Sequence, residues 1–284
     1  MTRRLVWLTL ALVVLAGCAP ISPQQRRDNA VRLAAAAGWR EIRLPAERFI
    51  FAGFIPQEIP LNSKILTIYI EGDGLAWLTS TRISSDPTPV NPIGLELALR
   101  HPQGPAAYLA RPCQYVTGGD ARGCTNTYWS DRRFSLEVVS SVSQAIDRLK
   151  QEFRAQHLQL VGYSGGGAIA ALVAARRSDV TSLITVAGNL DHQAWTRKHG
   201  VPPLSGSLNP ADEWQAISTL QQIHFVGGRD TVISSDIFAS FAGHFPARSR
   251  PELVIIPDAE HVCCWVERWP QLYESGGRQI SSAP

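Results

Sequence analysis

Three residues of the types that build a nucleophilic site lie far apart in this 284-residue chain: Ser164, Asp230 and His261. Ser164 is the centre of a G-x-S-x-G pattern that runs from Gly162 to Gly166. A serine hydroxyl is a poor nucleophile unless a histidine removes its proton and an acid orients that histidine. The residue types therefore predict acyl-transfer chemistry, with Ser164 as nucleophile, His261 as base and Asp230 as the orienting acid.

Each of the three residues lies within five residues after the end of a segment that is predicted to be a strand. Ser164 follows the apolar run 158–162 and precedes an Ala-rich segment, 168–175. Asp230 follows the apolar run 223–226, and His261 follows 252–256. Active groups of parallel sheets collect outside the carboxyl ends of the strands. We therefore expect the three side chains to meet at one edge of a sheet.

The rest of the chain has the same alternating organisation. Further strands are predicted at 48–55, 64–70, 106–110 and 182–186, and amphipathic or Ala-rich helices at 28–37 and 136–156. Strands that alternate with helices indicate a mostly parallel sheet with right-handed crossovers. The predicted fold class is α/β, with helices on both faces of the sheet, and the single domain is expected to span residues 28–284.

An oxyanion formed during acyl transfer needs backbone N–H donors. The first is expected from Gly165, the residue after the nucleophile, and the second from Asp73 in the loop Glu71-Gly72-Asp73-Gly74. A carboxylate beside a developing oxyanion would repel it. Asp73 can therefore serve only if its side chain points away or is neutralised.

Other acids and histidines are weaker candidates for the site. Asp236 falls one turn into the next predicted helix, and Asp258 is close to His261 in sequence. Two histidines precede Ser164, one lies inside a predicted strand, and three follow no suitable strand: His101, His157, His224, His192, His199 and His244.

Together the G-x-S-x-G turn and the order Ser164, Asp230, His261 resemble the α/β-hydrolase superfamily over residues 45–270. Within it, the chain looks like uncharacterised bacterial lipoprotein hydrolases with an E-G-D-G loop. Glu71 stands where the superfamily's His-Gly-x-x motif has its histidine. The resemblance implies an α/β-hydrolase fold, and two short segments, 75–104 and 189–209, remain to cover the site.

The amino terminus has the pattern of an export signal. Arg3 and Arg4 precede an apolar stretch too short to span a bilayer, and the residues 15–18, Leu-Ala-Gly-Cys, resemble the lipobox of bacterial lipoproteins. We expect residues 1–17 to be a signal peptide, Cys18 to be lipidated and residues 18–27 to be a tether. By the same resemblance, Ala19 favours the periplasmic face of the outer membrane in a cell with two membranes.

Loss of Arg3 and Arg4 with the leader lowers the formal net charge from +3 to +1. A nearly neutral chain without a basic run argues against nucleic acid as a partner. Four further cysteines permit three disulfide connectivities. Cys113 and Cys124 flank a turn-rich loop and are the simplest pair, whereas the state of Cys263 and Cys264 stays open.

The sequence thus predicts an envelope-anchored serine hydrolase that cleaves a small acyl ester or a lipid-like substrate, with carboxylesterase activity as the default. No metal-ligand spacing, phosphate loop or dinucleotide fingerprint occurs, so neither a metal nor a cofactor is expected. Two alternatives stay open: an acyltransferase with the same triad, and a binding lipoprotein without catalysis. The sequence carries no signal for the oligomeric state.

Overall fold

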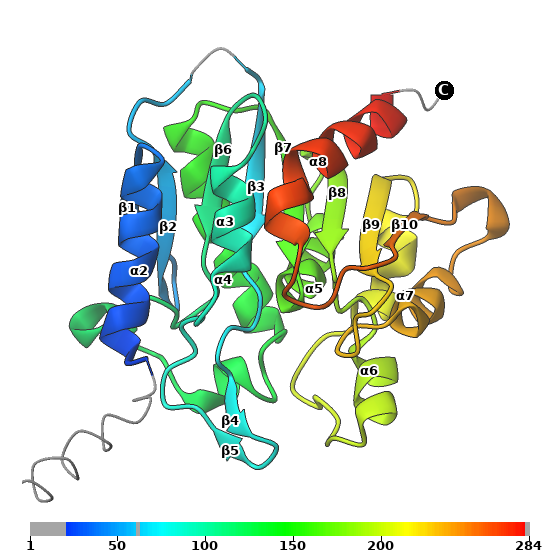
Figure 1. Ribbon diagram of the computed structural model, residues 1–284, viewed down its shortest axis with the longest axis horizontal. Coiled ribbons are helices and arrows are strands. Elements are labelled where there is room, and N and C mark those ends of the chain that lie inside the picture. Colours follow the sequence, from blue (N-terminus) through cyan, green and yellow to red (C-terminus); the bar gives the residue numbers. More distant parts are fainter. Residues whose placement is uncertain (1–20, 61–62, 282–284) are drawn as a thin grey trace, which may run out of the picture.

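An eight-stranded sheet runs through the centre of the computed structural model, which describes residues 21–60 and 63–281 (Figure 1). In spatial order the strands are β1 (Trp39–Pro45), β2 (Ile50–Pro56), β6 (Ala106–Leu109), β3 (Ile65–Ile70), β7 (His157–Tyr163), β8 (Val180–Val186), β9 (Gln221–Gly227) and β10 (Glu252–Ile256). In this spatial order, each strand from β6 to β10 is parallel to its neighbour. Strand β2 is antiparallel to both of its neighbours, β1 and β6. The predicted mostly parallel sheet is confirmed.

Helices cover both faces of this sheet, as predicted (Figure 1). One face packs against α4 (Leu136–Glu152), α5 (Gly165–Ala174) and α7 (Ser235–Ala242). The other face packs against α2 (Pro23–Ala36), α3 (Ile93–Leu99) and α8 (Trp265–Ser281). Short 3-10 helices occupy Gly118–Ala121, Asn126–Trp129, Pro210–Ile217 and Ala247–Ser249.

The alternation of side chains along β3 explains why helices are needed on both sides. Leu66, Ile68 and Ile70 point into one core, and Tyr69 points into the other. Because successive residues of a strand face opposite sides, a strand that is apolar at nearly every position must be buried on both faces. The nearly continuous apolar run that predicts this strand is thus also the reason for the two helical layers.

The segments predicted to cover the site are indeed short. Residues 75–104 form a two-stranded hairpin, β4 (Trp77–Thr79) and β5 (Arg82–Ile83), followed by α3. Residues 189–209 contain one helix, α6 (His192–His199). Among the described residues, no helix has both the length and the apolar character that crossing a bilayer requires.

The tether prediction is wrong in its second half, because α2 begins at Pro23. Ser22 accepts a hydrogen bond from the Gln25 backbone N–H, and the Gln25 side chain accepts one from Ser22, which together form a capping box. Pro23 occupies the first turn, where its missing N–H costs nothing. Residues 23–27 therefore belong to the folded domain, and Arg26 is buried. The predicted signal peptide and Cys18 lie outside the described residues.

Two disulfides occur in the described chain. Cys113 and Cys124 are bonded, which confirms the predicted pair. Cys263 and Cys264 are bonded to each other and so form a disulfide between adjacent residues. The second bond resolves the question that the sequence left open.

Candidate active site

Ser164 lies on a sharp turn between β7 and α5, with backbone angles φ 52° and ψ −121°. Positive φ is costly for a residue with a side chain and persists where surrounding structure enforces it. A Cβ on Gly162 would lie 2.3 Å from the Gly166 carbonyl oxygen, so only glycine lets the strand and helix approach this closely. The turn leaves the Ser164 side chain at the carboxyl end of β7, in the cavity described below.

A chain of two hydrogen bonds connects the three predicted residues. Ser164 Oγ lies 3.0 Å from His261 Nε2, and His261 Nδ1 lies 2.8 Å from Asp230 Oδ2. Asp230 Oδ1 accepts the backbone N–H groups of Val232 and Ile233, which fixes the carboxylate. Because a carboxylate can only accept, the proton of the neutral imidazole resides on Nδ1, and Nε2 is free to accept the serine proton.

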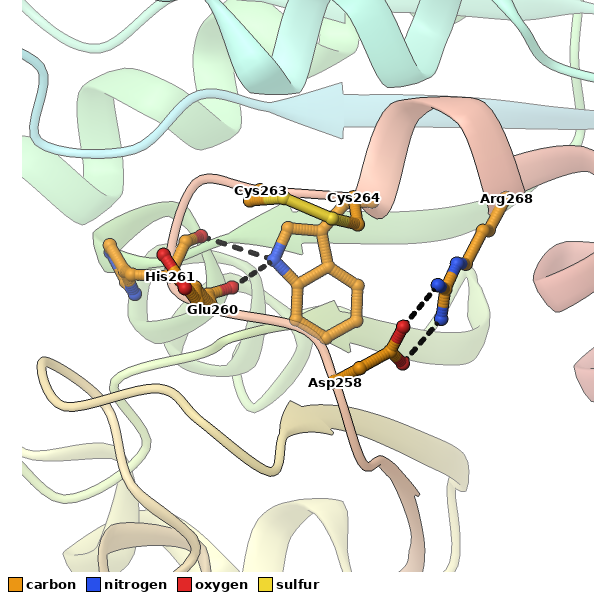
Figure 2. The surroundings of a disulfide bond; sticks show 7 residues. Asp258, Glu260, His261, Cys263, Cys264 and Arg268 are labelled. Atoms are coloured by element: carbon orange, nitrogen blue, oxygen red, sulfur yellow. Dashed lines mark hydrogen bonds and ion pairs between the residues drawn. A yellow bond between two sulfur atoms is a disulfide. The ribbon is translucent and has the colours of Figure 1, made fainter.

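The loop between β10 and α8 holds His261 through its backbone. The Tyr163 hydroxyl donates to the His261 carbonyl at 3.0 Å, and the Trp265 indole N–H donates to the carbonyls of Glu260 and His261. Figure 2 shows the Cys263–Cys264 disulfide on this turn, between His261 and the start of the helix. These contacts fix the backbone that carries the His261 imidazole.

The two other candidate acids, Asp236 and Asp258, form ion pairs with other residues. Asp236 is exposed and pairs with Lys198, and Asp258 forms a two-pronged ion pair with Arg268 (Figure 2). Among the described residues, the carboxylate that contacts the His261 imidazole is that of Asp230.

Two rival histidines are buried structural residues. His224 bonds to Thr185 within the sheet, and burial lowers the pKa of its imidazole to about 3. His101 bonds to the Tyr69 hydroxyl, and burial lowers its pKa to about 4. Each is held neutral by its surroundings and lies away from Ser164.

The loop after β3 and the turn after β7 come into direct contact at the predicted oxyanion donors. A Cβ on Gly165 would lie 2.1 Å from Asp73 Oδ1, so the Asp73 side chain lies over Gly165. Among residues 21–60 and 63–281, no acceptor takes a hydrogen bond from the backbone N–H of Gly165 or of Asp73. Both donors are thus unpaired within the described chain.

Two arginines neutralise Asp73. Arg133 Nη1 lies 2.7 Å from Asp73 Oδ2, and Arg111 Nη1 lies 3.0 Å from Asp73 Oδ1. Burial alone would raise the pKa of the Asp73 carboxyl, but attraction to Arg133 and Arg111 outweighs burial and holds the pKa below its usual range. The repulsion of an oxyanion that the sequence suggested is therefore cancelled by a buried ion cluster.

Sequence reasoning missed both arginines, because they lie 38 and 60 residues after Asp73 and no motif connects them. Arg111 lies just after β6, and Arg133 lies just before α4. Only the folded chain brings them together.

The side chain of Glu71 accepts hydrogen bonds from a separate group of residues. Its fully buried carboxylate accepts the backbone N–H groups of Gly94 and Leu95 at the start of α3, and the hydroxyl of Tyr108. Burial raises the pKa of this carboxyl above its usual value, against the effect of those hydrogen bonds. Glu71 thus ties the loop that carries Asp73 to a helix N-terminus, where negative charge is favoured.

A cavity of about 400 Å³ opens at Ser164 and His261. Its lining is mostly apolar and includes Trp77, Val90, Trp195, Val232 and Val262, with Arg133 and Asn189 as polar members. Within the described residues, no group of three or more histidine, cysteine or acidic side chains is arranged to hold a metal ion.

No protein-family model matches the chain, and no curated protein does. Solved structures are similar over most of its length. A structure described as a membrane phospholipase A and bacterial virulence factor is 18% identical, with a TM-score of 0.55 and full coverage of both chains. Est1E from Butyrivibrio proteoclasticus with bound ferulic acid is 11% identical, with a TM-score of 0.60 over 85% of this chain and 100% of that one.

A third similar structure is XC6422 from Xanthomonas campestris, described as an α/β serine hydrolase without a lid. It is 14% identical, with a TM-score of 0.55 over 87% of this chain and 96% of that one. At these identities the similarity is one of fold. The chain has the α/β-hydrolase fold, as its sequence predicted.

Proposed function

We propose that this protein is a serine hydrolase that cleaves an acyl ester through a covalent acyl-enzyme. The observation that carries the proposal is the hydrogen-bonded series Ser164–His261–Asp230 at the carboxyl end of the parallel strands. The distances of 3.0 and 2.8 Å are those at which a base can take the serine proton and an acid can orient the base.

In the acylation step, Ser164 Oγ bonds to the ester carbonyl carbon as its proton passes to His261 Nε2. The tetrahedral intermediate then collapses, the bond to the alcohol oxygen breaks, and His261 returns the proton to the leaving alcohol. In the second half, the oxygen of a water molecule bonds to the acyl carbonyl carbon as its proton passes to His261 Nε2. The bond from that carbon to Ser164 Oγ then breaks, and His261 returns the proton to Oγ. The sum is ester plus water to carboxylic acid plus alcohol.

The N–H groups of Gly165 and Asp73 would stabilise the negative oxygen of both intermediates. Gly165 begins α5, where the first N–H groups have no partner within the helix and the helix dipole is positive. The Asp73 carboxylate, paired with Arg133 and Arg111, adds no net repulsion.

We further propose that the chain is a lipoprotein of the bacterial envelope, anchored through Cys18 after loss of residues 1–17. The support is the pattern 15–18 together with the start of the folded domain at Pro23, close behind the proposed lipidation site. Stable attachment requires two or more acyl chains, which a lipidated amino-terminal cysteine supplies.

The test is labelling of the full chain, purified in detergent, with a fluorophosphonate probe. Ser164→Ala and His261→Ala variants are run in parallel, and Asp258→Asn serves as the control for a nearby carboxylate outside the triad. We expect labelling of the parent and of Asp258→Asn, and none of Ser164→Ala. A folded parent that does not react at pH 7 to 9 would overturn the hydrolase proposal and favour a binding protein on this fold.

Acyl transfer to an acceptor other than water uses the same triad. Product analysis with an acyl ester in the presence and absence of an alcohol acceptor separates the two reactions. Free fatty acid as the main product supports hydrolysis, and an acylated alcohol as the main product supports a transferase.

A further inference from the structure

Exposed apolar side chains gather in the lining of the cavity. Ten large hydrophobic residues are exposed in the described chain. Four of them line the cavity, Trp77, Val90, Val232 and Val262, and a fifth, Leu78, follows Trp77 on β4. We call these five residues the apolar rim. Such clusters are rare on monomeric soluble proteins and mark surfaces that contact another molecule or a membrane.

The most prominent part of the rim is the β4–β5 hairpin, which lies at the lower end of the molecule in Figure 1. Trp77 is 39% exposed and Leu78 is 46% exposed. The hairpin carries one charged residue, the exposed Arg82. Exposed tryptophan and leucine beside an arginine are typical of segments that lie at the interface of an anionic bilayer.

The amino-terminal helix is fixed next to the same rim. The buried Arg26 guanidinium donates to the carbonyl oxygens of Asp86 and Thr88, and Arg27 pairs with the Asp86 carboxylate at 3.0 Å. Val90 of the rim follows two residues after Thr88. The first turns of α2 are thus bound to the segment that leads into the cavity wall.

The amino-terminal start of the folded domain therefore lies near the cavity mouth. In Figure 1 the start of α2 and the β4–β5 hairpin are at the same, lower end of the molecule. Ile21, the first described residue, is exposed. The proposed lipidation site, Cys18, precedes Ile21 by three residues in the sequence.

We propose that the apolar rim docks on the bilayer that holds the lipid anchor, so that the cavity opens directly onto the membrane. The substrate is then an acyl ester of a bilayer lipid, which enters the cavity without crossing water. This inference rests on the hydrolase and anchor proposed above. It adds the orientation of the enzyme and the class of its substrate.

Docking can be measured without catalysis. The full lipidated chain, with Ser164→Ala to prevent turnover, is reconstituted in vesicles of phosphatidylethanolamine and phosphatidylglycerol. A nitroxide is attached at Leu78→Cys, or at Ile65→Cys as the matched control. Ile65 is an exposed apolar residue at the opposite, amino-terminal end of β3, and the cysteines at 113, 124, 263 and 264 are paired.

We expect the label at position 78 to be shielded from a water-soluble nickel chelate and accessible to oxygen, and the label at position 65 to show the reverse. Equal access of the chelate to both labels would overturn the proposed orientation. Because neither outcome depends on turnover, this experiment fails or succeeds separately from the labelling with fluorophosphonate.

The substrate class is tested with Leu78→Asp, since Leu78 does not line the cavity. Against phospholipid in the same vesicles, we expect a loss of roughly tenfold or more, because an apolar contact with the bilayer is replaced by a charge. Hydrolysis of a soluble short-chain ester is expected to stay within about twofold, and Ile65→Asp to leave both activities unchanged. Equal activity of Leu78→Asp and the parent on vesicles would contradict the inference.

Discussion

Arg133 lies 2.7 Å from Asp73 and turns a carboxylate next to the expected oxyanion position into one half of an ion pair. Arg111 binds the other oxygen of the same carboxylate. Both guanidinium groups are buried, and the Asp73 side chain is mostly so. The Asp73 carboxylate, whose charge alone would oppose an oxyanion, is thus paired with two arginines.

Removal of the Asp73 charge is expected to destabilise the protein. Asp73→Asn leaves two buried guanidinium groups without their counter-charge, and we expect a loss of about 2–4 kcal/mol in the free energy of unfolding at pH 7, measured in urea. Asp236→Asn, at an exposed pair with Lys198, is the control and is expected to cost about 0–1 kcal/mol.

The difference in the free energy of unfolding between the parent and Asp73→Asn should depend on pH. The pKa of Asp73 is lowered in the folded protein, so its charge stabilises the fold fully above the unfolded value near 3.9. That contribution is lost as the pH falls through 3.9 and then through the lower folded pKa. Urea unfolding between pH 7 and pH 3 should show a constant gap above about pH 5 that narrows below it. A gap that widens in acid would contradict the role of Asp73.

Asp230→Asn is expected to abolish most of the reactivity of Ser164 while the fold persists. An amide N–H facing His261 Nδ1 favours the tautomer that carries its proton on Nε2, which cannot accept the serine proton. The rate constant of fluorophosphonate labelling should fall on the order of 10³-fold or more. A labelling rate within about tenfold of the parent would indicate that another group orients His261.

Gly165→Ala tests the close approach of the two loops. The added Cβ would lie 2.1 Å from Asp73 Oδ1, so the Asp73 loop must move away from the turn that carries Ser164. We expect kcat for a soluble ester to fall by about 10²-fold, the usual cost of a lost oxyanion donor. Gly119→Ala is the control, since no atom lies within 4 Å of its added Cβ and kcat should not change.

The adjacent-residue disulfide is expected to support catalysis more than global stability. Cys264 has φ 79°, a conformation that favours glycine, and lies three residues after His261. In a Cys263→Ser/Cys264→Ser double variant we expect the turn to relax and kcat to fall roughly threefold to tenfold, because the imidazole is less well positioned. Circular dichroism checks that the variant is folded.

Cys113→Ser/Cys124→Ser provides the contrasting case. That disulfide closes a loop between residues 11 apart, and its loss should cost about 3 kcal/mol of stability in the chain-entropy model. The Cys263/Cys264 variant should therefore lower mainly kcat, and the Cys113/Cys124 variant mainly the free energy of unfolding. A loss of kcat in the second variant equal to that in the first would argue against a local role for Cys263–Cys264.

Much of the fold was predictable because the parallel strands are buried on both faces and appear as continuous apolar runs. Strand β3 was expected to start at residue 64 and starts at Ile65, and β10 begins and ends as predicted. Strand β1 was missed, because it lies at the edge of the sheet and mixes exposed charged residues with apolar ones. The start of α2 was missed although Ser22, Pro23 and Gln25 form a recognisable capping signal.

The sheet and the edge at which Ser164, Asp230 and His261 lie could be predicted from the chain alone, because each residue follows a strand and the carboxyl ends of parallel strands share one edge. The surroundings of these three residues follow only from the folded structure. The neutralisation of Asp73 by Arg111 and Arg133, the attachment of α2 beside the cavity and the apolar rim all join segments distant in the chain. Such contacts have no periodicity and no fixed spacing, so they exist only once the chain has folded.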